Sequence, residues 1–175
     1  MRILCLGDSN TYGYDPRGYF CGRYDADDRW VDLTAKGTGF DIVNLGSNGR
    51  TIPRHFPDRT SADILLVMLG TNDLLQGATA KEAAHRMERF LTLLLPYYGK
   101  ILLVAPPPMK RGAWVDTDDL VMESIRLAGE YQTLADNLEI PFVDTRNWNV
   151  ELTFDGVHFT EAGHHTFAKQ LIKYL

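Results

Sequence analysis

The sequence predicts an α/β protein, a three-layer α/β/α sandwich with a central five-stranded parallel sheet. Five short runs rich in Ile, Leu and Val recur along the chain, at residues 2–6, 41–45, 64–69, 101–105 and 142–144. They are mostly continuous rather than alternating, which is typical of strands buried on both faces. Stretches with helical patterning separate them, and strands alternating with helices favour a parallel sheet covered on both sides.

Three helices are predicted from their caps and spacing. After the third run, Thr79 to Glu82 fits a capping box, and a helix should continue until Pro96 ends it. A second helix should span about 119–138, and a last one should run from Thr160 to residue 175. The inward-facing residues expected on the first helix are Ala83, Met87, Phe90, Leu91 and Leu94, and on the second Leu120, Ile125, Ala128, Tyr131 and Leu134.

Two long segments break the regular alternation. Residues 11–29 are rich in turns and aromatics, namely Tyr12, Tyr14, Tyr19, Phe20 and Tyr24, and residues 106–118 follow with a run of prolines and Trp114. Long irregular loops in a compact domain are often functional. Both follow the carboxyl ends of predicted strands, where open α/β sheets bind ligands. Tyr12 and Trp114 are therefore candidates for a substrate pocket, whereas Trp30 and Trp148 are expected to pack in the core or at its rim.

Size and charge limit the classes of function. The 175 residues are predicted to form a single domain, 1–175, with a formal net charge of −5. Arg50, Arg54 and Arg59 are scattered rather than clustered, so we expect no nucleic-acid partner. No apolar run approaches the length of about 18 residues needed for a membrane span.

The start of the chain and its two cysteines predict a cytoplasmic location. The apolar run before Gly7 is too short for a signal peptide. Cys5 lies in a strand-like run and Cys21 in a loop-like one, so two reduced thiols are expected rather than a disulfide.

Four polar, glycine-bearing motifs fall at the same predicted edge of the sheet. Residues 7–10 follow the first strand, 44–51 the second and 70–73 the third, while 155–158 lie in the loop after the fifth. Together they offer a nucleophile, a base with a carboxylate partner, and several N–H donors. This combination is typical of an acyl-transfer site.

Ser9, Asp155 and His158 carry the chemistry of that site. A serine hydroxyl needs a neighbouring base to remove its proton. The imidazole of His158 can do so near neutral pH if a carboxylate fixes its tautomer and stabilises the cation. Asp155 stands three positions before His158, so both side chains can face the same way on one turn. The chain has no G-x-S-x-G motif, which disfavours the α/β-hydrolase fold.

These motifs resemble those of the SGNH (GDSL-type) hydrolase superfamily over the whole chain, in all four blocks and in the family's order. The opening Gly-Asp-Ser-Asn-Thr-Tyr-Gly-Tyr and residues 48–51 look most like the arylesterase and acyltransferase members. The resemblance implies a flavodoxin-like SGNH fold and a serine carboxylic ester hydrolase that needs no cofactor or metal. It implies that Ser9 is the nucleophile, His158 the base and Asp155 its orienting partner. The oxyanion hole would be formed by Ser9, Gly49 and Asn72.

Asn10 and Gly46 are the positions where the motifs depart from the family pattern or offer a choice. Asn10 stands where the family most often has Leu, at a position that does no chemistry. Gly46 competes with Gly49 as oxyanion donor, and Gly49 is preferred because it shortly precedes Thr51, as in the family. Asp8 and Asp73 are interpreted as supporting residues. Asp8 would cap the following turn, and Asp73 would accept backbone N–H groups.

The substrate is left open by the sequence. Small, short-acyl esters are expected, because the chain is short and has no long apolar lid. Carbohydrate acetylesterase, thioesterase, lysophospholipase and acyltransferase activities are the alternatives within the family, and a homo-oligomer is one possible assembly. A metal site at Asp155, His158, His164 and His165 is disfavoured, because the last two point in different directions on a helix. A non-catalytic phosphate or nucleotide binder is disfavoured by the absence of a P-loop or G-x-G-x-x-G motif, and a catalytically silent member is the remaining alternative.

Overall fold

The predicted parallel sheet is present in the computed structural model, which describes residues 1–18, 22–55 and 60–175. The strands are β1 (Arg2–Gly7), β2 (Asp41–Gly46), β3 (Ile64–Met68), β4 (Ile101–Val104) and β5 (Phe142–Val143). All are parallel, in the order β2-β1-β3-β4-β5. This is the flavodoxin-like order, and the fold class is confirmed. Tyr19, Phe20, Cys21 and Arg59 lie outside the described residues.

The predicted helices are found within a few residues of their expected bounds. They are α4 (Ala80–Leu94), α5 (Asp118–Leu138) and α6 (Glu161–Leu171), while α1 (Ser9–Tyr12), α2 (Trp30–Thr38) and α3 (Thr71–Leu75) are not among the predicted elements. Thr79 and Glu82 form the capping box at the start of α4. The last helix does not continue to residue 175, because a 3-10 turn (Ile172–Tyr174) follows α6.

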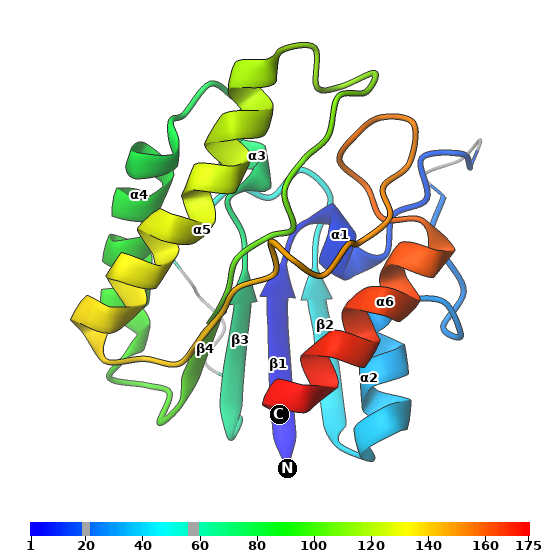
Figure 1. Ribbon diagram of the computed structural model, residues 1–175. Coiled ribbons are helices and arrows are strands. Elements are labelled where there is room, and N and C mark those ends of the chain that lie inside the picture. The colour runs from blue at the N-terminus through cyan, green and yellow to red at the C-terminus, as the bar shows by residue number, and fades with distance from the viewer. Residues whose placement is uncertain (19–21, 56–59) are drawn as a thin grey trace.

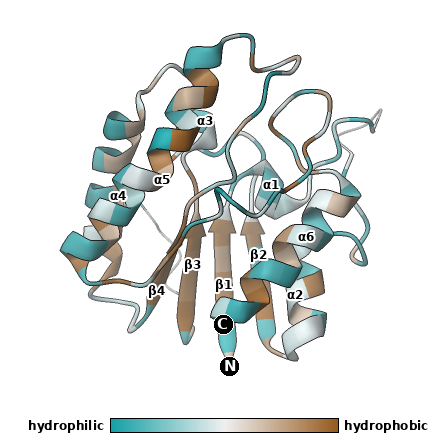
Figure 2. Cartoon of the chain, in the orientation of Figure 1, coloured by the Kyte–Doolittle hydropathy of each residue, from teal (hydrophilic) through white to brown (hydrophobic). Residues whose placement is uncertain are grey.

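The helices form two layers, one on each face of the sheet (Figure 1). Successive strand residues point to opposite faces, so Leu65 and Val67 pack with α4 and α5, whereas Ile64 and Leu66 pack with α2 and α6. Figure 2 shows the visible strands as predominantly hydrophobic along their length, as expected for a sheet covered twice. The expectation that Ile125 faces the interior is wrong. That side chain is only partly buried, and Leu127 packs in the core instead.

The strand order also predicts where a ligand would bind. The chain leaves β1 towards β2 on one side and returns to β3 on the other, so the crevice at the carboxyl ends of β1 and β3 is the switch point of the fold. Residues 8–12 and 70–75 follow these two strands. Within the described ranges, no helix combines the length and apolar character needed to cross a membrane.

Candidate active site

Ser9 lies on a tight turn between β1 and the single-turn helix α1. Gly7 ends the strand, and a Cβ at that position would collide with the side chain of Thr11. Asp8 is the N-cap of α1, and its Oδ1 accepts the N–H of Asn10 at 3.0 Å. The cap begins the helix directly at Ser9, and the hydroxyl therefore stands at the carboxyl edge of the sheet.

Asp155 organises the turn that carries His158. Its Oδ1 accepts the Thr153 hydroxyl at 2.8 Å and the backbone N–H groups of Val157 and His158 at 2.9 and 3.0 Å. Its Oδ2 accepts His158 Nδ1–H at 2.7 Å. Burial by itself would raise the pKa of this carboxyl, but the hydrogen bonds from His158, Val157 and Thr153 outweigh it and lower the pKa to about 2. Asp155 is therefore a fixed anion at neutral pH.

His158 connects that carboxylate to Ser9. Its Nε2 lies 2.9 Å from Ser9 Oγ, across 149 residues of sequence. Because Nδ1 donates to Asp155, Nε2 is left as the acceptor for the serine hydroxyl. All three side chains are buried, and Ser9 keeps 7% of its surface exposed. The arrangement can take the proton of Ser9 and hold the resulting imidazolium beside a carboxylate.

The structure distinguishes the two glycines that compete as oxyanion donors. The Gly46 N–H already donates to Asn44 Oδ1 at 2.8 Å. Gly49 has φ +71° and open space on its Cβ side, and its N–H donates to no acceptor within the described residues. The turn that carries it is attached to β1 by the Ser47 N–H, which donates to Gly7 O at 3.2 Å. Of the two, Gly49 has the free donor.

Asn72 and Asp73 lie at the start of α3, after β3. Asn72 Nδ2 donates to Arg50 O at 3.1 Å, which orients the amide and leaves it a second N–H. Asp73 is 1% exposed and accepts the Ile52 N–H at 2.9 Å and Arg86 Nη1 at 2.8 Å. Asp73 therefore ties the segment after Gly49 to α3 and α4.

Arg50 holds together the strand ends that carry these residues. No role was predicted for it from the sequence. Its Nη1 donates to Gly7 O at 3.0 Å and also to Leu45 O. One side chain therefore joins the carboxyl ends of β1 and β2, and its own carbonyl orients Asn72. Its position directly after Gly49 is the sequence signal, but the contact itself depends on strand pairing.

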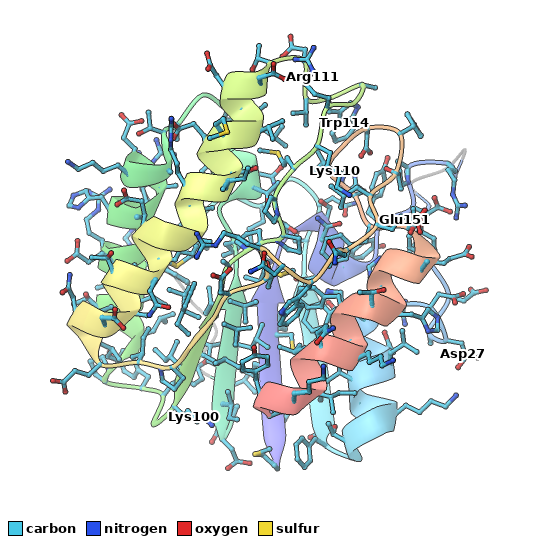
Figure 3. The ribbon with its side chains drawn as sticks, in the orientation of Figure 1. Asp27, Lys100, Lys110, Arg111, Trp114 and Glu151 are labelled. Atoms are coloured by element: carbon cyan, nitrogen blue, oxygen red, sulfur yellow. The ribbon has the colours of Figure 1, made fainter. Side chains whose placement is uncertain are left out.

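Aromatic rings flank His158. The rings of Tyr14 and Trp114 approach the imidazole edge-on, with centroids 4.8 and 5.1 Å away. Trp114 is 52% exposed and lies on the irregular segment beside the turn that bears His158 (Figure 3). Tyr12 makes a different contact, because its ring packs under the Arg23 guanidinium at 4.2 Å. Tyr14, rather than Tyr12, contacts His158.

The other tryptophans and histidines considered as candidates pack in the core or form a surface ion pair. Trp30 and Trp148 pack against Phe167 in the core. His164 is buried, which lowers its pKa to about 3, and its Nδ1 accepts the Trp30 N–H at 3.4 Å. His165 is exposed and pairs with Asp28 at 3.1 Å. In the part of the chain that the structure describes, no three His, Cys, Asp or Glu side chains are grouped as metal ligands would be.

Comparisons with known proteins identify the family of the chain and agree with its fold. The profile of the GDSL-like Lipase/Acylhydrolase family matches residues 5–166. The native aryl esterase of M. smegmatis is 29% identical, with a TM-score of 0.85 over 99% of this chain and 97% of that chain. A carbohydrate acetylesterase family member from Sinorhizobium meliloti is 29% identical, with a TM-score of 0.84 over 99% and 96%.

A putative arylesterase from Agrobacterium tumefaciens str. C58 is 26% identical, with a TM-score of 0.83 over 99% of this chain and 97% of that chain. No functionally curated protein matches the sequence. The family match spans most of the chain, and the solved structures share its fold. The chain belongs to the GDSL-like lipase/acylhydrolase family and is a carboxylic ester hydrolase.

Proposed function

We propose that this enzyme hydrolyses small carboxylic esters with short acyl groups through an acyl-enzyme on Ser9. The observation that carries the proposal is the continuous hydrogen-bonded chain from Asp155 through His158 to Ser9 Oγ, with distances of 2.7 and 2.9 Å. Serine is a nucleophile only when a positioned base takes its proton, and this geometry supplies that base.

In the acylation step, Ser9 Oγ attacks the ester carbonyl carbon while its proton passes to His158 Nε2. The oxyanion that forms accepts hydrogen bonds from the N–H groups of Ser9 and Gly49 and from the second N–H of Asn72. His158 then gives its proton to the departing alkoxide oxygen, and the C–O bond breaks. Water, deprotonated in turn by His158, releases the carboxylic acid and restores Ser9.

The surroundings of His158 favour a flat or apolar leaving group. Since His158 protonates the departing oxygen, groups beside its ring line the alcohol side of the site. Those groups are Tyr14 and Trp114, and Phe154, at the edge of the same turn, is 64% exposed. In the described part of the chain, the sheet, its helices and the loops that join them account for the residues, which leaves little chain to enclose a long acyl group.

A carbohydrate acetylesterase is the second candidate. It is favoured by the 29% identity and TM-score of 0.84 to the carbohydrate acetylesterase family member from Sinorhizobium meliloti, which equals the identity to the M. smegmatis aryl esterase. Aromatic rings such as Trp114 can also stack on the apolar face of a sugar. Acetate esters fall within both candidates, which then differ in the alcohol.

The test is hydrolysis of p-nitrophenyl esters from acetate to decanoate by the wild-type enzyme, Ser9→Ala and Ser61→Ala. Ser61 is an exposed serine outside the site, and its variant is the matched control. We expect the rate to fall about 10³-fold or more in Ser9→Ala alone, with an optimum at short acyl chains. Equal rates in wild type and Ser9→Ala would refute the serine mechanism, and an optimum at decanoate would refute the short-acyl assignment.

Two further measurements complete the assignment. Mass spectrometry of the enzyme quenched during turnover should show Ser9 carrying the acyl group, and its absence under burst conditions would contradict the intermediate. Phenyl acetate and acetylated sugars, compared by kcat/KM, separate the aryl ester from the carbohydrate assignment. A preference for sugar acetates of more than about 10-fold, or 1.4 kcal/mol, would favour the second candidate.

A further inference from the structure

Asn10, the residue directly after Ser9, makes a pair of hydrogen bonds across the sheet edge. Its side-chain Nδ2 donates to Val157 O at 3.1 Å, and its Oδ1 accepts the Phe159 N–H at 3.0 Å. These backbone groups belong to the residues on either side of His158. We infer that Asn10 is a positioning residue that holds His158 in line with Ser9, a role that rests on the proposed serine mechanism.

The amide is itself held in place. Asn10 is 4% exposed, and its backbone N–H donates to Asp8 Oδ1 at 3.0 Å. Its backbone carbonyl accepts Trp30 Nε1–H at 2.9 Å. With the backbone fixed on both sides and both side-chain polar atoms bonded, the amide has one low-energy orientation.

Asn10 is next to Ser9 in the chain, and its two hydrogen bonds therefore link Ser9 to the turn that carries His158. Because Asn10 is covalently attached to Ser9, its side chain ties the base to the nucleophile's own backbone. Other contacts on the turn reach different partners. The Tyr24 hydroxyl donates to Phe159 O at 3.1 Å, and the N–H of Lys110 donates to Gly156 O at 3.0 Å. These attach the turn to the irregular segments, whereas Asn10 attaches it to the serine.

Leucine at this position would lose both contacts. It has the same branched skeleton as asparagine but no polar atom, so the buried Phe159 N–H and Val157 C=O would lose their Asn10 partners. The turn would have to shift to satisfy them. A displacement of about 1 Å in a reacting group can cost about 10²-fold in rate.

The experiment compares the wild-type enzyme with Asn10→Leu, Asn10→Asp and Leu91→Ala. Asn10→Asp keeps the acceptor for the Phe159 N–H and loses the donor for Val157 O. Leu91 is fully buried in α4, and its truncation is the control for loss of stability without change at the site. Each protein is titrated to completion with a fluorophosphonate, and kcat is expressed per labelled serine on p-nitrophenyl acetate.

We expect kcat per labelled serine to fall about 10- to 100-fold in Asn10→Leu and less in Asn10→Asp, with KM changed less than about threefold. Leu91→Ala should lower only the labelled fraction. Wild-type turnover per labelled serine in Asn10→Leu would overturn the inference. If Asn10→Leu does not fold, wild-type turnover per labelled serine in Asn10→Asp would overturn it. Failure of the serine mechanism is separate, because it would appear as full activity in Ser9→Ala.

Discussion

The buried carboxyl of Asp8 should make the enzyme less stable as the pH rises, and Asp8→Asn should remove this effect. Asp8 is 2% exposed, and burial raises its pKa from 3.8 to about 6, against the opposing effects of the Asn10 N–H, His158 and the Thr71 side chain. The folded protein therefore holds the Asp8 proton over a range where the unfolded chain has lost it. Stability from this group is fully present below pH 4 and is lost as the pH rises through 6.

The size of the effect follows from the shift. About two pKa units at 1.36 kcal/mol each correspond to about 3 kcal/mol, of which about 2 kcal/mol is lost between pH 4 and pH 8. Asn keeps a side-chain oxygen that can accept the Asn10 N–H, and Asn and Asp are similar as N-caps. The substitution thus removes the titration and preserves the cap.

The assay is urea unfolding of wild type and Asp8→Asn at each pH from 4 to 8. The free energy of unfolding of the variant minus that of the wild type should increase by about 2 kcal/mol over this range. Taking the difference cancels the titration of groups common to both proteins. A difference that does not change with pH would refute the reasoning, because it would mean that Asp8 titrates alike in the folded and unfolded chains.

Three further predictions concern the site. Asn72→Ala should lower kcat on p-nitrophenyl acetate by about 10²–10³, with Asn137→Ala as the exposed control, and an equal effect in both would contradict the oxyanion role. Asp155→Asn should lower kcat by about 10⁴. It should also abolish about 2 kcal/mol of stability that the wild type has above pH 4 and loses as the pH falls through 2, measured by acid unfolding. Trp114→Ala should raise KM for aryl esters several-fold and leave the unfolding midpoint unchanged; an unaltered KM would mean that Trp114 does not contact the alcohol part of the substrate.

Local patterns were sufficient for most of the fold. Continuous apolar runs predict strands that are buried on both faces. Side chains alternate in direction along a strand, so all of them are buried only when both faces of the sheet are covered. The capping box at Thr79 uses contacts within one helical turn, and it therefore predicts the start of α4 to the residue. Ile125 shows the limit of this reasoning, since helical spacing marks a stripe but does not fix how far the stripe is rotated against the sheet.

In the candidate site, too, some contacts can be expected from sequence spacing and others depend on the fold. Asp155 and His158 are three residues apart, so their hydrogen bond could be expected from spacing alone. The sequence already favours Gly49 over Gly46, but the physical reason, a Gly46 N–H that is bonded to Asn44, is visible only in the structure. The contact of Tyr14 with His158 and the packing of Tyr12 against Arg23 likewise appear only there. Neither neighbour is evident from the sequence motif.

The α/β/α class, the edge of the sheet where the polar motifs meet and the residue types available for acyl transfer could all be predicted from the sequence. Those properties follow from periodicity and from groups a few positions apart. The approach of Ser9 Oγ to within 2.9 Å of His158 Nε2, and the bonds of Asn10 to the backbone on both sides of His158, could be seen only once the chain was folded. These contacts join residues almost 150 positions apart. They exist because strand pairing and burial bring the ends of β1 and β3 and the turn that carries His158 to one edge of the sheet.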